Sequence, residues 1–182
     1  MNEWITDLLA LQDLDMKIRN LKLRIDTIPA EKKRLNSLVK DAMDDVEVAK
    51  DGLRRIERNI KDQEGEAEKL NEASRKLLTQ SAMVKKNNEY QAMMADIKAK
   101  KKAISDIETK ILELLDQAED QQKNVTAAEK ELAVTQKTVK AEMADLVELK
   151  QELEEDIAEK LKLRKAYEGK VDTQTLNVYH RL

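Results

Sequence analysis

The chain has 182 residues, of which 39% are charged and 2% aromatic, with no Phe, so it lacks the bulk for a thick globular core. Ala, Glu, Lys, Leu and Asp dominate, with three Gly and one Pro, a composition typical of long helices or a coiled coil. The formal charge of -3 excludes a chain-wide polyanion binder or an acidic tail. Disorder is the alternative for so polar a chain, and the regular recurrence of apolar residues argues against it.

Cysteine is absent, which excludes disulfide bonds and thiolate metal sites and is compatible with a reducing cytoplasm. Acidic Glu3 and Asp7 stand where a signal peptide would carry basic residues. No apolar run approaches the ~18 residues of a membrane span. We therefore expect a soluble, cytoplasmic protein without a membrane partner.

A first helical arm is predicted over residues of about 3–80, because apolar residues recur at spacings of three and four. Pro29 lacks an amide donor and disfavours helical geometry in Ile28, so a kink or short break is expected there. Before Pro29 this stripe, the seam, comprises Trp4, Leu8, Leu11, Leu14, Ile18, Leu21, Ile25 and Ile28.

Beyond Pro29 the seam is expected to slip by one residue and then to alternate spacings of four and three, which is typical of a left-handed coiled coil. Gly52 and Gly65 lie inside this segment, where each costs about 1 kcal/mol relative to Ala. They mark either bends and close approaches or tolerated exposed positions. The expected seam residues are Leu35, Leu38 and Ala42 and, after the slip, Val46, Ala49, Leu53, Ile56, Ile60, Gln63, Ala67, Leu70, Ser74 and Leu77.

A second arm is predicted over residues of about 89–168, after a tip at about 81–88. Asn88 is the expected N-cap, with Gln91 completing a capping box. Small or polar seam residues predict a thin, flexible middle. The expected seam is Tyr90, Met94, Ile97, Ile104, Ile107, Ile111, Leu114, Ala118, Gln121, Val125, Ala128, Leu132, Thr135 and Val139, continuing less strictly through Leu146, Leu149, Leu153, Ile157 and Leu161.

The second arm is expected to end near Tyr167, with Gly169 in the left-handed conformation. Asp172 is then the expected N-cap of a short final helix from Thr173 to Leu182. The domain division that follows is a hairpin at 1–170 and a terminal helix at 171–182.

Two arms of about 75 residues, on either side of a turn near position 84, would pair antiparallel over about 110 Å at 1.5 Å per residue. The predicted fold is all-α: a long antiparallel coiled-coil helical hairpin, kinked near Pro29, with a short C-terminal helix. Reflection about the tip places Trp4 near residues 164–167, where aromatic side chains would staple the base. The expected state is a monomer or weak homodimer; the rival arrangement is a dimer of extended rods.

A two-helix rod offers almost no concave, water-poor pocket, so we expect no enzymatic activity and no catalytic or cofactor-binding residue. Carboxylate runs such as 152–156 are interpreted as a solvated helix face. His180 is the single histidine, and without cysteine it cannot form the usual structural zinc set, so no metal ligand is predicted.

Residues 75–102 carry eight basic and two acidic side chains, a local charge of +6, which leaves -9 for the rest of the chain. At a hairpin tip such lysines could meet phosphates or an acidic protein surface. Ordinary solvated lysines are the alternative, and Met83, Met93 and Met94 either form an adaptable surface or cap the core. The predicted partner-binding residues, here called the tip surface, are Lys85, Lys86, Asn87, Asn88, Tyr90, Met93, Met94, Lys98, Lys100, Lys101 and Lys102.

Four strings occur in the order and spacing of a known family: 11–15 (LQDLD), 28–29 (IP), 84–92 (VKKNNEYQA) and 176–181 (LNVYHR). With them the chain resembles the bacterial coiled-coil zinc-ribbon proteins, long catalogued as a domain of unknown function, with members in Chlamydia and Helicobacter. The resemblance implies a helical hairpin followed by a zinc ribbon with two Cys-x-x-Cys pairs. The sequence stops about where that ribbon would begin, so zinc is expected only downstream. Thr173 stands where the family usually has proline.

The resemblance also implies partners: an alternative sigma factor, flagellar or type III secretion components, and in one case RNA. The preferred interpretation is a chaperone-like, non-enzymatic adaptor or scaffold for bacterial regulatory or secretion proteins. The alternative is an RNA-binding arm, like the helical hairpin of seryl-tRNA synthetases, that uses Lys98 and Lys100 to Lys102. A prefoldin-like holdase is a third interpretation, although no strand pattern supports its β-rich base.

Overall fold

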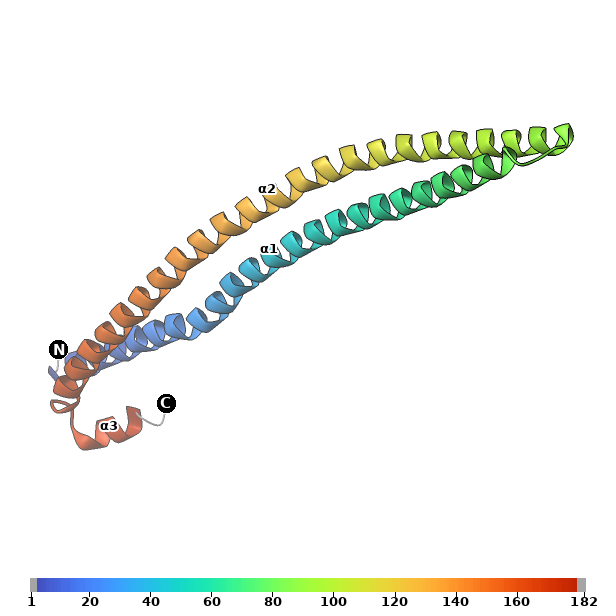
Figure 1. The fold of residues 1–182 in the computed structure, drawn as a ribbon. Coiled ribbons are helices and arrows are strands. Elements are labelled where there is room, and N and C mark those ends of the chain that lie inside the picture. Colours follow the sequence, from blue (N-terminus) through green and yellow to red (C-terminus); the bar gives the residue numbers. More distant parts are fainter. Residues whose placement is uncertain (1–2, 180–182) are drawn as a thin grey trace. The chain divides into compact units, whose positions relative to one another are not determined.

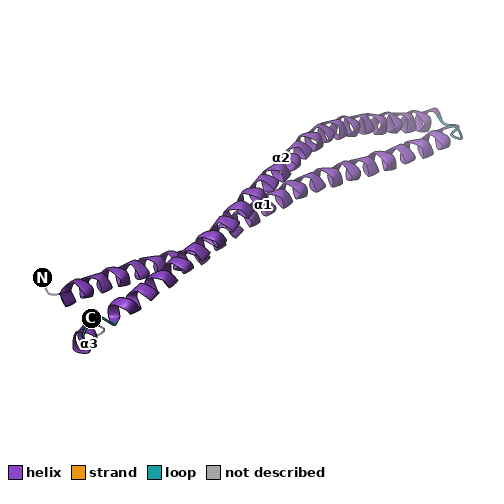
Figure 2. Ribbon diagram, turned by 90° about the vertical axis from the view of Figure 1, so that its left-hand side faces the viewer, coloured by secondary structure: helices purple, strands orange, loops and turns teal. Residues whose placement is uncertain are grey.

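The structure, a computed structural model, describes residues 3–179 and consists there of helices and their connections (Figures 1 and 2). Helix α1 spans Glu3–Ser81, α2 spans Asn87–Glu168 and α3 spans Thr173–Tyr179. A turn at 82–86 joins α1 to α2, which pack against each other as a helical hairpin. The predicted all-α hairpin with a short C-terminal helix is thereby confirmed. None of the described helices combines the length and apolarity needed to cross a membrane.

The chain divides into two compact units, each built from both long helices. The terminal unit comprises Met1–Asp41 and Val134–Leu182, and so includes α3. The turn unit comprises Ala42–Ala133 and includes the turn between α1 and α2. The division at residue 170 that the sequence suggested stays a prediction.

In the terminal unit, the predicted seam forms the core. Leu11 and Leu35 are fully buried, as the heptad spacing requires for residues that face the partner helix. The other buried apolar side chains of this unit are Leu14, Ile18, Ile28, Val139, Leu153 and Val171.

Helix α1 runs without interruption through Pro29, so the alternative of a short break there was wrong. Proline removes one backbone hydrogen bond, but Ile28 and Leu35 on either side are buried, and this packing keeps both segments helical. Nearby, the Thr27 hydroxyl donates to the Arg24 carbonyl at 2.7 Å. Figure 1 shows α1 bending within its blue part, which contains Pro29.

The seam of the first arm is more regular than predicted. Leu38 is exposed, whereas Val39 is half-buried. The seam therefore passes from Leu35 through Val39 and Ala42 to Val46, with spacings of four, three and four and no slip. The prediction that Leu38 belongs to the seam was wrong, because Val39 keeps the regular alternation of spacings and Leu38 does not. Two other expected seam residues, Trp4 and Leu161, are also exposed.

In the turn unit fewer apolar side chains are buried than in the terminal unit. The buried apolar residues are Val46, Ile97, Leu114 and Val125, and the buried polar residues are Ser74 and Ser81. The Ser81 hydroxyl donates to the Leu78 carbonyl at 2.8 Å, which satisfies its hydrogen-bonding requirement inside the protein.

The start of α2 differs from the prediction. Its first residue is Asn87, and the Lys86 carbonyl accepts the Tyr90 amide at 3.1 Å, so Lys86 stands at the N-cap. Asn88 lies inside the helix, and the predicted capping box was wrong. Glu89 instead supplies negative charge in the first turn, which the helix dipole favours.

The end of α2 at Glu168 lies one residue from the expected end. Gly169 does not adopt a positive φ, so its predicted left-handed conformation was wrong. The chain leaves α2 through a bond from the Lys170 amide to the Tyr167 carbonyl at 3.0 Å. A tight final turn of this kind satisfies a terminal carbonyl without the left-handed conformation.

The predicted N-cap of α3 is confirmed. Asp172 Oδ1 accepts the amides of Gln174 at 2.9 Å and Thr175 at 3.0 Å. A hydrogen bond from the Thr175 hydroxyl, followed by those from the two amides, lowers the pKa of Asp172. Helix α3 is described as far as Tyr179; the expected end at Leu182 and the single histidine, His180, lie outside the described residues.

Candidate functional site

The predicted tip surface lies at the α1–α2 turn and along the first turns of α2. Its lysines are exposed except Lys100, which is half-buried. Lys100 lies three residues after the buried Ile97 and so continues the spacing of the seam, a position at which a lysine can be half-buried while its ammonium group reaches solvent. The fully exposed lysines are Lys85, Lys86, Lys98, Lys101 and Lys102.

These lysines are largely free of acidic neighbours. Lys86 pairs with Glu89 at 3.2 Å, an exposed pair that contributes little to stability. Within residues 3–179, no carboxylate lies within 4.0 Å of the ammonium group of any other tip-surface lysine. Positive charge therefore remains available at the turn.

Apolar side chains are exposed among these lysines. Met83 has 77% of its surface exposed, Tyr90 44% and Met94 38%. The sequence placed Tyr90 and Met94 in the seam, which was wrong: both are exposed, and Met93, four residues before the buried Ile97, is half-buried instead of Met94. Leu78, at the end of α1, is also exposed. The tip surface thus combines cationic groups and apolar groups. The lysines are flexible, and methionine side chains can adapt to a partner's shape.

A second cluster of polar residues, in the terminal unit, was not found from the sequence. Asp15 on α1 accepts Arg164 Nε of α2 at 2.6 Å on Oδ1 and the Tyr179 hydroxyl of α3 at 2.9 Å on Oδ2. Arg164 Nη1 also donates to Glu168 at 3.1 Å. We call these four residues the Asp15 cluster. It joins all three helices at partly buried positions, where a charge pair is stronger than at an exposed one.

The cluster changes the acidity of its members. The hydrogen bond to Asp15 is the main cause of a raised pKa of Arg164, which keeps the guanidinium charged. Burial, followed by the hydrogen bond to Asp15, raises the pKa of Tyr179. At neutral pH the phenol is therefore a stable donor to the carboxylate.

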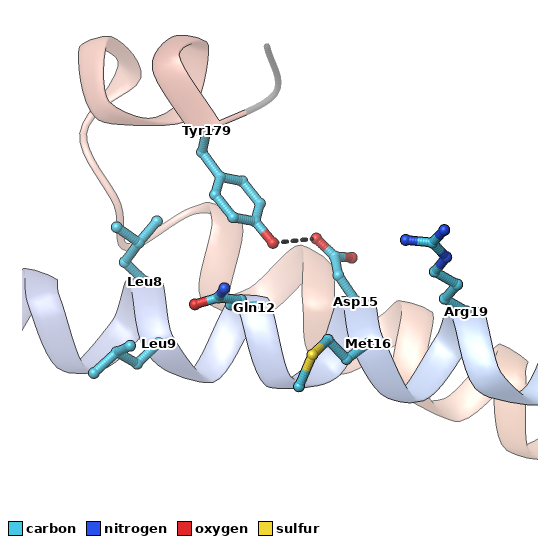
Figure 3. A pocket seen from close by; sticks show the side chains of 7 residues that line it. All are labelled: Leu8, Leu9, Gln12, Asp15, Met16, Arg19 and Tyr179. Atoms are coloured by element: carbon cyan, nitrogen blue, oxygen red, sulfur yellow. Dashed lines mark hydrogen bonds between the residues drawn. The ribbon is translucent and has the colours of Figure 1, made fainter. Parts of the chain in front are cut away.

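Figure 3 shows a pocket beside this cluster, between α1 and Tyr179. Its volume is about 610 Å³, and it is open to solvent along α1. Polar and apolar side chains share its wall: Leu8, Leu9, Gln12, Asp15, Met16, Arg19 and Tyr179.

A smaller, more apolar pocket of about 320 Å³ shares Leu8 and Tyr179 with the first and includes Trp4. Trp4 lines this pocket with Thr175 and Val178 of α3 and remains partly exposed. Tyr167, with which it was expected to staple the arms, lies beside Lys170, whose Nζ is 5.0 Å from the ring centre. Residues of α3 therefore lie beside Trp4, and the expected contact of Trp4 with residues 164–167 stays a prediction.

The Asp15 cluster joins two of the strings that carried the family resemblance. Asp15 closes the first string, 11–15, and Tyr179 belongs to the last, 176–181. The hydrogen bond between them connects residues 164 positions apart in the chain. A sequence signal was present in both strings, but spacing alone could not show that they meet.

The zinc that the resemblance implies does not fit the residues of this chain. There is no cysteine, and in the part of the chain that the structure describes no three His, Asp or Glu side chains gather as metal ligands. We therefore derive no metal chemistry from this chain.

These features define a class of protein. It is a helical hairpin that exposes both lysines and apolar side chains at its turn, and a short third helix docks against the first part of α1. No family model and no curated protein matches the chain. Among solved structures it is similar to CT398 from Chlamydia trachomatis, determined at 2.12 Å, with a TM-score of 0.79 and 22% sequence identity. The match covers 98% of this chain and 76% of the Chlamydia chain, and it shows a shared fold.

Proposed function

We propose that this chain is a non-enzymatic, cytoplasmic adaptor that binds an acidic bacterial protein through its tip surface. The observation that carries the proposal is the exposure of Met83, Tyr90 and Met94 among lysines that have almost no acidic partners. Exposed apolar groups surrounded by charge are typical of protein interaction sites.

Charge supports an acidic partner. Residues 75–102 carry +6 within a chain whose total charge is -3, so an acidic protein would be attracted specifically to this segment. The apolar side chains then supply contact area that a purely ionic encounter lacks. Through the resemblance to the coiled-coil zinc-ribbon family, the candidate partners are an alternative sigma factor or components of flagellar or type III secretion systems.

A site-specific photocrosslinker tests this proposal. Placed at Met83, which lies in the turn directly before the tip surface, it should join a discrete acidic protein when the full chain is expressed in cells of the source bacterium. Placed at Val48, which is equally exposed in the turn unit, it should not. A partner that crosslinks equally from both positions would contradict binding through the tip surface.

Charge reversal supplies the second measurement. Replacing Lys98, Lys101 and Lys102 by Glu should reduce that crosslink at least tenfold, because it reverses the charge that attracts the partner. The matched control replaces three exposed lysines of the same unit outside the tip surface, Lys61, Lys69 and Lys130. Equal loss in both variants would show that net charge, and not the tip surface, governs binding.

The second candidate function is RNA binding. Lys98, Lys101 and Lys102 recur at spacings of three and four and are exposed on α2, which suits contact with successive phosphates. Lys100, the fourth lysine of that hypothesis, is half-buried and contributes less. RNA retained at low salt, and lost when the four lysines are replaced by Glu, would favour this alternative. Unchanged retention would remove it.

A further inference from the structure

One polar contact in the turn unit crosses directly between the two long helices. Gln121 Nε2 of α2 donates to the backbone carbonyl of Ala49 on α1 at 2.9 Å. Asn124 Nδ2 approaches Gln121 Oε1 at 3.3 Å, so both ends of the Gln121 amide have partners. A seam position usually holds an apolar side chain, and a glutamine there requires a specific partner on the facing helix.

Gly52 makes room for this contact. A Cβ atom at Gly52 would lie 2.8 Å from Gln121 Nε2 and 3.2 Å from Cδ, so the flexible end of the Gln121 side chain would have to leave its present position. Gly65, in the same helix, has nothing within 4 Å of the equivalent position. Only Gly52 of these two glycines has a side chain from the facing helix close to it. Of the two interpretations given above, a close approach and a tolerated exposed position, the close approach is therefore confirmed for Gly52.

A shift of one heptad would keep the apolar seam positions of α1 facing apolar seam positions of α2, because the pattern repeats every seven residues. The half-buried Ala49, Ala118 and Ala128 fit several neighbours, whereas the buried Val46, Leu114 and Val125 would exchange one apolar neighbour for another. Such a shift moves α2 along α1 by about 10 Å, since each residue rises 1.5 Å.

The hydrogen bond from Gln121 to the Ala49 carbonyl does distinguish between registers. A shift of one heptad would set Gln121 opposite Asp45 or Asn59 in place of Gly52, because these residues lie seven positions away on α1. Their side chains would fill the space that Gly52 leaves open. Gln121 would then lose the Ala49 carbonyl and would have the exposed side chain of Asp45 or Asn59 as its partner instead.

We propose that Gly52 and Gln121 form a register lock that fixes α2 against α1 in the turn unit. They are positioning residues: the lock decides which residues of the two helices face each other on the way to the turn. The inference does not rest on the proposed function, because the register can be measured without any partner.

Paired spin labels measure the register directly. The chain has no cysteine, so cysteines introduced at exposed Val48 on α1 and Lys110 on α2 carry the labels alone. In the otherwise unchanged chain, pulsed electron resonance should give one distance. In Gln121→Leu a second population, displaced by about 10 Å, should appear. A single unchanged distance in Gln121→Leu would overturn the proposal.

The two glycines provide a matched pair. Gly52→Ala should displace Gln121 and produce the same second population. Gly65→Ala should keep one distance and raise the melting temperature, because alanine favours the helix and meets no neighbour. A second population in Gly65→Ala, or none in Gly52→Ala, would count against the lock.

A combined variant separates register from folding. Gly52→Ala with Gln121→Ala removes both the close contact and the polar group, so it should melt above Gly52→Ala alone while still populating two registers. If this double variant returned to a single distance, the small seam residues would suffice to fix the register, and the lock would be refuted.

Discussion

In the terminal unit, α1 and α2 bury large leucine and isoleucine side chains and share a partly buried charged cluster with α3. In the turn unit, the same helices bury fewer apolar side chains, among them Ile97 and Leu114, and they also meet through a glutamine that reaches a backbone carbonyl. A helical hairpin thus relies more on buried apolar side chains in one unit and more on a specific polar contact in the other. Apolar burial contributes to the free energy of folding, whereas the polar contact determines which residues of the two helices face each other. Substitutions can separate these two contributions.

The largest effect is expected in the core of the terminal unit. Leu11→Ala should lower the free energy of unfolding by about 3 kcal/mol, since it leaves a cavity at a fully buried position. Val125→Ala, in the turn unit, should cost only about 1.5 kcal/mol, because fewer methyl groups are lost. Urea unfolding followed by circular dichroism measures both.

Leu9→Ala is the control for that comparison. Leu9 lies on the same helix and is exposed, so its truncation should change stability by less than about 0.5 kcal/mol. If Val125→Ala proved as costly as Leu11→Ala, the contrast in packing between the two units would be wrong.

The next effect concerns the Asp15 cluster. Arg164→Ala should cost about 2 kcal/mol, because it leaves the partly buried Asp15 carboxylate without its closest cationic partner. Arg34→Ala, which breaks an exposed pair with Glu31 in the same unit, should have no measurable effect on urea unfolding. Equal effects would mean that the Asp15 cluster behaves as an ordinary surface pair.

Docking of α3 against α1 should weaken at alkaline pH. The pKa of Tyr179 is raised above its ordinary value of 10.0, so its contribution is complete below pH 10 and is lost as pH rises through the folded-state pKa. Methyl resonances of Val178 and Leu8, followed by nuclear magnetic resonance, should shift together in that range. The physical cause is the loss of the proton that Tyr179 donates to Asp15.

Tyr179→Phe is the control for this titration. It lacks the ionisable hydroxyl, so its docking should be weaker by about 1 kcal/mol and should not change between pH 9 and 12 as docking of the wild type does. An alkaline transition that persisted in Tyr179→Phe would assign the effect to another group.

The smallest effect is expected for the charge pair between the arms of the turn unit. Lys50 Nζ and Glu129 Oε1 are 2.7 Å apart, but their side chains are 40% and 50% exposed. A double-mutant cycle with alanine should give a coupling of about 0.5 kcal/mol or less. A coupling as large as that between Asp15 and Arg164 would remove the distinction between the two units.

The hairpin could be predicted from the sequence because heptad spacing depends only on neighbouring residues. Local signals misled where packing overrides them. Pro29 does not end α1, since the helix on both sides is buried against its neighbours, and Asn88 does not cap α2, since the helix already begins at Asn87. Asp172 was predicted correctly because a cap needs only the amides two and three residues later.

The contacts between distant residues could not be predicted. Asp15 and Arg164 are 149 positions apart, and whether they meet depends on the register of two long helices. Gln121 was visible as a polar seam residue, but only the facing Gly52 explains it. The tip surface could be named from its charge, whereas the exposure of Tyr90 and Met94 required the structure.

Trp4 gives this molecule a built-in optical signal. It is the single tryptophan of the chain, and within the described residues it shares an apolar pocket with α3. Its indole emission will therefore differ between docked and released α3, because release exchanges Val178 and Tyr179 for water around the ring. Binding of any partner that releases α3 or strengthens its docking can therefore be followed in the unlabelled protein by the wavelength of maximal Trp4 emission.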